Sequence, residues 1–130
     1  MPPILIYSLD AAMRNLLVQI VDEYHTDVRA FSKFREAFTY LETLPPTLAI
    51  FDAQDDIPIA TTQALLLNYP LEQLRQHRFV LLTFPQRYLP PTLGVQVRPL
   101  NIYHVRKPFE LDLLYGVINQ AWQALNHPSS

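Results

Sequence analysis

Residues 101–110 read NIYHVRKPFE, and this stretch joins a strand-like segment to a helix-like segment. Apolar and aromatic residues run up to Arg106, and a helical pattern begins directly after Lys107-Pro108-Phe109. Proline suits the first turn of a helix, because its missing N–H costs no hydrogen bond there. The lysine is less expected, since a charge at the end of a buried strand needs a partner. That partner has to come from another part of the chain.

Short apolar runs alternate with amphipathic patterns along the rest of the sequence. Strands are predicted from the runs at 4–7, 27–31, 47–51, 79–84 and 102–105. Apolar residues at helical spacing predict helices at 13–24, 34–44 (capped by Ser32), 60–68, 71–77 and 109–125. Four prolines leave little room for regular helix within 85–100. Five strands alternating with helices predict a doubly wound parallel α/β sheet with helices on both faces.

Length and composition restrict the class of protein further. The 130 residues suit one domain, which we place at 1–126 with a tail at 127–130, and 49% hydrophobic residues can form its core. A net charge of −2 gives no indication of a nucleic-acid or membrane surface, and no apolar segment reaches membrane-spanning length. The absence of cysteine excludes disulfides and thiolate catalysis. We therefore expect a cytoplasmic setting, without nucleic-acid or membrane partners.

Polar side chains stand where four of the predicted strands end. Ser8 follows the first strand, Asp52 the third and Lys107 the fifth, and Thr83 lies near the end of the fourth. In parallel sheets of this kind, chemistry collects at the carboxyl ends of the strands. A carboxylate, a hydroxyl and an ammonium group should therefore meet at one edge, and Asp52 is the predicted partner of Lys107.

These motifs carry a resemblance to a known family. With LAIFD ending in Asp52, VLLTF containing Thr83 and VRKPF containing Lys107-Pro108, the chain resembles the receiver domain of bacterial two-component response regulators over nearly its whole length. The stretch SLDAAMRNLL is similar to the family's first loop and helix. The resemblance implies a flavodoxin-like five-stranded sheet, a signalling role in a phosphorelay rather than an enzyme activity, and a cis Lys107-Pro108 bond.

The resemblance also implies a role for each residue of the site. Asp52 would accept a phosphoryl group from a histidine kinase, and Thr83 and Lys107 would bind the phosphoryl oxygens. These roles fit phosphoryl transfer, which requires a nucleophile in line with the bond that breaks and cations that stabilise the negative charge on the phosphoryl oxygens. His104 falls at the family's switch position in the fifth strand. The predicted partner is a histidine kinase or another signalling protein.

The metal site of the family is incomplete in this sequence. The family has two consecutive acids after the first strand, but this chain has Ser8 and Leu9 at those positions. Mg²⁺ needs oxygen ligands, usually carboxylates, and leucine has none. Asp52 remains as a metal ligand, whereas Asp10 lies one residue late and is more naturally a helix-start residue. We therefore predict that Mg²⁺ binds weakly or not at all.

Three functions remain open on the sequence alone. The trio Asp52, Thr83 and Lys107 favours a phosphorylatable switch, and we predict an atypical receiver domain in phosphorelay signalling that retains Asp52 as the phosphoacceptor position. The missing acid pair and the proline-broken fourth helix favour a pseudo-receiver, which is an interaction module that does not depend on phosphorylation. A small enzyme on the same fold is the weakest reading, because the sequence shows no nucleophile–base pair or cofactor loop.

The last predicted helix is apolar around more of its circumference than one core stripe requires. Four of its residues can cover the sheet: Leu113, Leu114, Val117 and Ala121. Leu111, Tyr115 and Trp122 then form an edge with no obvious place in the core. We predict a homodimer or partner contact at this edge. The alternative is that neighbouring segments, such as 85–100, bury it.

Overall fold

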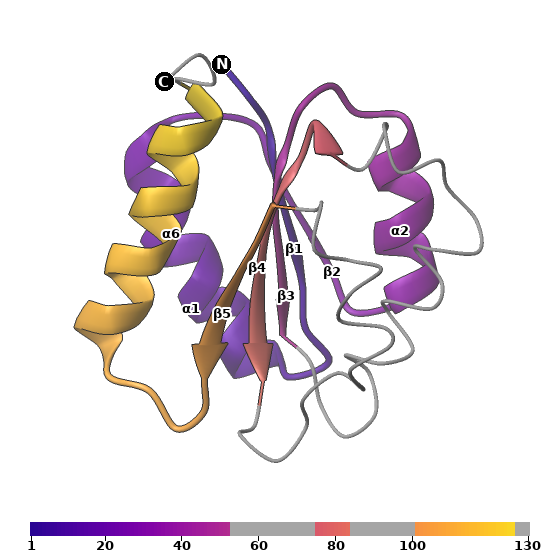
Figure 1. Cartoon of the computed structure of the whole chain (residues 1–130). Helices are drawn as coiled ribbons and strands as arrows, with labels where there is room; N and C mark the ends of the chain where they lie inside the picture. Colours follow the sequence, from indigo (N-terminus) through magenta and orange to yellow (C-terminus); the bar gives the residue numbers. More distant parts are fainter. Residues whose placement is uncertain (53–74, 84–100, 127–130) are drawn as a thin grey trace, which may run out of the picture.

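The computed structural model describes residues 1–52, 75–83 and 101–126. Its centre is a five-stranded sheet in the order β2-β1-β3-β4-β5, with every neighbouring pair parallel (Figure 1). The strands are β1 (Ile4–Tyr7), β2 (Val28–Phe31), β3 (Leu48–Asp52), β4 (Arg78–Thr83) and β5 (Asn101–Arg106). The predicted doubly wound parallel sheet is therefore confirmed.

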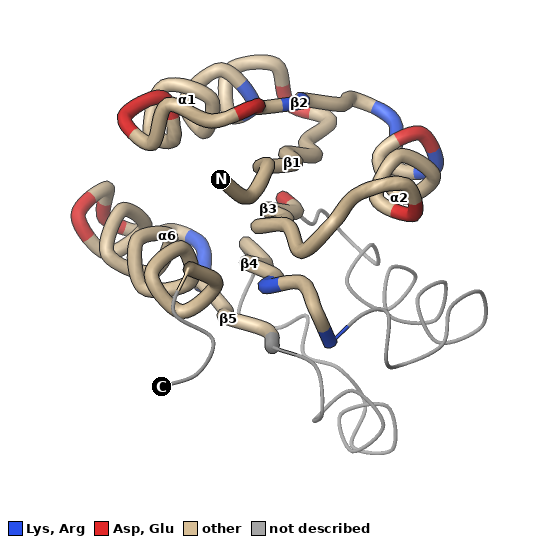
Figure 2. The backbone as a smooth tube through the Cα atoms, turned by 90° about the horizontal axis from the view of Figure 1, so that it is seen from above, with Lys and Arg blue, Asp and Glu red and all other residues tan. Residues whose placement is uncertain are grey.

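Helices lie on both faces of the sheet. The described helices are α1 (Ala11–Val21) with its 3₁₀ continuation η1 (Asp22–Tyr24), α2 (Phe34–Glu42) and α6 (Leu111–Asn126). Seen from above, α1 and α6 cover one face and α2 lies on the other (Figure 2). No helix in the described ranges is long and apolar enough to cross a membrane.

Three strands, β1, β3 and β4, are buried on both sides, because successive side chains point to opposite faces and helices cover each face. Toward α1 and α6 the strands contribute Ile4, Ile6, Leu48, Ile50, Val80, Leu82 and Val105. Toward α2 they contribute Leu5, Tyr7, Ala49, Phe51, Phe79 and Leu81. Burying one such large side chain stabilises the fold by about 2 kcal/mol. This two-sided burial explains why β1, β3 and β4 read as continuous apolar runs.

Helix boundaries differ from the prediction by up to three residues, most clearly before α2 and at the end of α1. The residue that precedes α2 is Lys33, without a side-chain capping bond, so the predicted cap at Ser32 was wrong by one residue. The first predicted helix is divided, because α1 ends at Val21 and a 3₁₀ turn follows. The predicted helix at 60–68, most of the one at 71–77, the whole of 85–100 and the tail at 127–130 lie outside the described residues.

The orientation of α6 also differs from the prediction. Its buried residues are Leu114, Ile118, Ala121, Trp122 and Leu125. Leu113, which was expected to cover the sheet, is 56% exposed. The helix is thus turned so that its core stripe is centred nearer to Ile118 than to Val117.

The prediction that Trp122 belongs to an exposed contact edge on α6 is wrong. This side chain is only 6% exposed and stacks on Tyr24, with ring centroids 4.7 Å apart. The Tyr24 hydroxyl also donates a hydrogen bond to Asn119 Oδ1 at 3.1 Å, which ties η1 to α6. The indole is buried because η1 lies beside α6 in the fold, although the two are far apart in sequence. Leu111 and Tyr115 are exposed, and a homodimer or partner contact there stays a prediction.

Gly116 offers a test of the helix itself. It lies inside α6, it is exposed, and a Cβ built on it would meet no atom within 4 Å. Glycine in a helix interior costs about 1 kcal/mol relative to alanine, because its unfolded backbone has more freedom. We therefore expect Gly116→Ala to raise the free energy of unfolding by 0.5–1 kcal/mol, roughly. Urea denaturation measures this change, and a loss of stability would show that something packs against Gly116.

Candidate functional site

The carboxyl edge of the sheet brings Ser8, Asp52 and Lys107 together. Tyr7 lies opposite Phe51 in the register of β1 and β3, so the next residues, Ser8 and Asp52, are neighbours across the two strands. Side chains alternate between the two faces of a sheet along each strand. Ser8, Asp52 and Lys107 each lie two residues after a strand residue that faces α1 and α6, so they lie on that same side. Strand order and this alternation together therefore place the three polar groups on one side of one edge.

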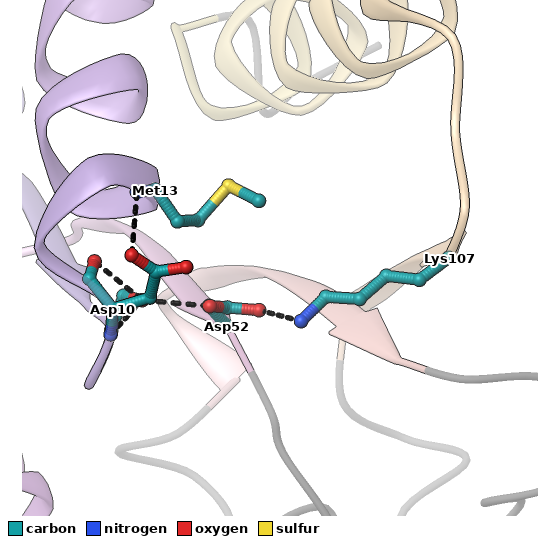
Figure 3. A network of polar contacts seen from close by, with 5 residues as sticks. Asp10, Met13, Asp52 and Lys107 are labelled. Carbon is teal, nitrogen blue, oxygen red and sulfur yellow. Dashed lines mark hydrogen bonds and ion pairs between the residues drawn. The ribbon is translucent and has the colours of Figure 1, made fainter.

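Lys107 is the ion-pair partner of Asp52. Lys107 Nζ contacts Asp52 Oδ1, and the two side chains are 11% and 1% exposed, respectively (Figure 3). Among the described residues, Oδ1 has this ion pair but accepts no hydrogen bond. Lys107 extends from the end of β5, and the Lys107-Pro108 peptide bond is cis, as the resemblance implied. The partner predicted for Lys107 is thus confirmed.

Ser8 binds the other carboxylate oxygen of Asp52. Its hydroxyl donates a hydrogen bond to Asp52 Oδ2 at 2.7 Å, and Ser8 is completely buried. From the sequence, Ser8 was placed at this edge of the sheet and at a position where an acid is missing, but its contact with Asp52 was not predicted. The signal that could have found the contact is the strand order, because β1 and β3 are neighbours in a doubly wound sheet. Asp52 is therefore held on both oxygens by side chains of the chain itself.

Buried carboxylate charge also affects the neighbouring aromatic cluster. Burial raises the pKa of Tyr7, and the negative charge of Asp52 raises it further. The Tyr7 ring packs edge-on against Phe34 and tilted against Phe51, on the face that α2 covers. Asp52 therefore lies between an apolar interior and its two polar partners, and this setting makes the contacts of Ser8 and Lys107 strong.

The described residues around Asp52 do not fit the magnesium site that the fold family implies. Asp10 caps α1, with its Oδ1 accepting hydrogen bonds from Ala12 N at 2.9 Å and Met13 N at 3.4 Å. This is the helix-start role that the sequence favoured for Asp10. Leu9 is exposed and has no ligand atom. In the described ranges, no group of three or more His, Cys, Asp or Glu side chains could hold a metal ion.

Two further predicted site residues are placed only in part. Thr83 ends β4, and its backbone lies opposite Arg106, but its side chain is outside the described residues. His104 lies on β5 three residues before Lys107, with an exposed side chain. The phosphoryl-binding role of Thr83 and the switch role of His104 stay predictions.

Solved structures with the same architecture are numerous. A CheY-like response regulator receiver domain protein from Methanospirillum hungatei JF-1 matches with a TM-score of 0.70 at 17% identity, over 96% of this chain and 98% of that one. The chemotaxis protein CheY4 of Vibrio cholerae matches with a TM-score of 0.67 at 16% identity, over 93% of this chain and 98% of that one.

A third similar structure is the signal receiver domain of a signal transduction histidine kinase from Syntrophus aciditrophicus. It has a TM-score of 0.68 at 21% identity, over 95% of this chain and 92% of that one. No protein-family model and no curated protein matches the sequence. Identities at this level establish architecture, and the covered fractions span nearly the whole chain in each case. The chain therefore has the flavodoxin-like fold of response-regulator receiver domains.

Proposed function

We propose that this chain is an atypical receiver domain of two-component signalling that acts as a protein-interaction module without a phosphorylation cycle at Asp52. The observation that carries the proposal is the state of the carboxylate. Asp52 Oδ1 is paired with Lys107 and Oδ2 accepts a hydrogen bond from the buried Ser8 hydroxyl, where the family has a metal-binding acid, and this second contact lowers the nucleophilicity of the carboxylate. The signalling context is supported by structural neighbours that are named as parts of histidine kinases and response regulators.

The absent acid pair supports the same proposal. Phosphoryl transfer to a carboxylate needs cations on the transferred group, and magnesium bound by carboxylates is the usual source. Ser8 and Leu9 stand where the family has these carboxylates, and the Asp10 carboxylate is engaged in capping α1. Lys107 supplies one positive charge, but that charge is already paired with Asp52. The partner class is a histidine kinase or another signalling protein.

A second candidate function is a phosphorylatable switch. The specific observation in its favour is the contact of Lys107 with Asp52 at the end of β3, which is the pairing that a phosphoacceptor site of this family would keep. In this case Ser8 would have to release Oδ2 before the transfer. The small-enzyme reading gains no supporting site among the described residues.

Small phosphodonors distinguish the two candidates. Incubation of the protein with acetyl phosphate or phosphoramidate and Mg²⁺, followed by intact mass spectrometry, measures incorporation directly. We expect no gain of a phosphoryl group in the wild type, because Asp52 is held on both oxygens and the metal ligands are missing. Incorporation that disappears in Asp52→Asn would overturn the interaction-module proposal and establish the switch. A conventional receiver domain treated in parallel shows that the donor is active.

A further inference from the structure

The hydroxyl of Ser8 is fixed in position before it reaches Asp52. Its Oγ accepts a hydrogen bond from Asp10 N at 3.1 Å, so the single hydroxyl hydrogen remains for donation. Two acceptors are within range, the Asp10 carbonyl at 3.2 Å and Asp52 Oδ2 at 2.7 Å. The shorter contact to a charged oxygen is the stronger one. The hydrogen of Ser8 therefore points at the carboxylate.

The backbone of Ser8 is held equally firmly. Ser8 N donates to Phe31 O on β2 at 3.1 Å, and Arg14 Nη1 donates to Ser8 O at 2.8 Å. These bonds tie the residue to β2 on one side and to α1 on the other. Because the residue is fixed by its neighbours, Asp52 meets a preorganised donor rather than a freely rotating hydroxyl.

We infer that Ser8 makes the Asp52 site indifferent to divalent cations, by donating its hydroxyl hydrogen to the one oxygen that Lys107 leaves available. A cation on Asp52 would have to displace this buried hydrogen bond and lie near the Lys107 ammonium. An aspartate at position 8 would instead put two carboxylates side by side, and such a pair favours binding of a cation. Ser8 thus determines which charge balances Asp52.

The inference concerns the regulation of the same site as the proposed function, and its biological meaning rests on that function. Its readout is cation binding, whereas the proposed function is tested by phosphoryl incorporation. The two can therefore fail separately. A metal-indifferent site that still gains a phosphoryl group would overturn only the proposed function, and a metal-binding site that gains none would overturn only the inference.

Thermal unfolding with and without millimolar Mg²⁺, at matched ionic strength, tests the role of Ser8. We expect the melting temperature of the wild type to be the same in both buffers. Ser8→Asp should lose about 5 °C or more without Mg²⁺, because two carboxylates then lie close together in a buried site. Added Mg²⁺ should restore most of this loss by binding only the folded state. Calorimetric titration of both proteins with Mg²⁺ should give heat only for the variant.

A matched control separates this effect from added charge alone. Gln123→Glu also adds one carboxylate, but on the exposed side of α6, and its melting temperature should not respond to Mg²⁺. The inference is overturned if Mg²⁺ stabilises the wild type as much as Ser8→Asp, or if a folded Ser8→Asp protein shows no response.

Ser8→Ala keeps the inference testable if Ser8→Asp does not fold. The alanine variant removes only the hydroxyl, and we expect it to lower the melting temperature by about 5 °C through loss of a buried bond to a charged oxygen. The same substitution in an Asp52→Asn background should cost clearly less, because the acceptor is then uncharged. Equal losses in the two backgrounds would show that the Ser8 hydroxyl does not act through Asp52.

Discussion

Lys107→Met is expected to lower the free energy of unfolding by about 3 kcal/mol, because it leaves a buried carboxylate without its cation. Asp52 is 1% exposed, and among the contacts of the described residues its charge would then keep the Ser8 hydroxyl. Methionine keeps most of the length and apolar stem of lysine, so the loss reports mainly on charge. Urea denaturation of the wild type and the variant measures the change.

The double variant shows whether this loss comes from the pair. Asp52→Asn should also destabilise the protein, since the Lys107 ammonium is 11% exposed and loses the charge that it contacts. The double variant Asp52→Asn/Lys107→Met should lose clearly less than the sum of the two single losses. Fully additive losses would contradict a direct interaction between the two residues.

An exposed ion pair in the same chain provides a matched control. Arg29 Nε lies 3.5 Å from Asp27 Oδ1, and both side chains are more than half exposed. Pairs of this kind contribute less than about 1 kcal/mol, because water screens the charges. Arg29→Met should therefore change stability much less than Lys107→Met. Similar losses for the two variants would mean that burial does not determine the effect at Lys107.

The second large effect is a loss of stability in acid that arises from His77. This residue lies just before β4, is almost completely buried and packs edge-on against Phe79. Its Nδ1 accepts a hydrogen bond from Thr47 N at 3.0 Å, at the start of β3. Protonation would turn this acceptor into a donor facing another N–H group. Burial accordingly lowers the pKa of His77 from 6.5 to about 4.

The direction of the pH effect follows from this lowered pKa. Between the unfolded pKa of 6.5 and the folded pKa of about 4, the unfolded chain binds a proton that the folded protein does not. The contribution of neutral His77 to the free energy of unfolding is therefore fully present above pH 6.5 and is lost as the pH falls toward 4. The loss amounts to about 3 kcal/mol in total. Urea denaturation across this pH range measures the slope.

His77→Asn isolates the histidine from other groups that titrate in the same range. The side-chain oxygen of asparagine can accept the hydrogen bond from Thr47 N, but it does not take up a proton near neutral pH. Stability of the variant should therefore depend less on pH between 6.5 and 4 than that of the wild type. Parallel slopes for the two proteins would refute the assignment to His77.

Local patterns in the sequence were sufficient for the sheet and for one half of the site. The apolar runs predicted all five strands to within one residue at each end. The reason is clearest for β1, β3 and β4, because strands buried on both faces have a composition that does not depend on distant partners. The pair of Asp52 and Lys107 could be predicted for a related reason. Both residues directly end or follow such a run, and parallel strands bring their carboxyl ends to one edge.

Contacts between distant segments decided what the sequence pattern left open. Periodicity shows that α6 has a wide apolar surface, but only the position of η1 beside it buries Trp122 against Tyr24. The roles of His77 and Ser8 have the same origin. A histidine or a serine reads as an ordinary polar residue until the neighbouring strand presents the N–H of Thr47 or the carboxylate of Asp52.

The sequence by itself therefore determined the strands and the chemical groups at their carboxyl ends, because each of these follows from the side chains of one short segment. The alternation of strands with helices along the chain determined the parallel arrangement. The tertiary structure alone decided that Ser8 donates to the second oxygen of Asp52. The physical reason is that a hydroxyl carries no charge and has no preferred spacing in sequence. Its hydrogen bond forms only when the distance between donor and acceptor is right to within a few tenths of an ångström. The packing of β1 against β3 and the turn into α1 set this distance.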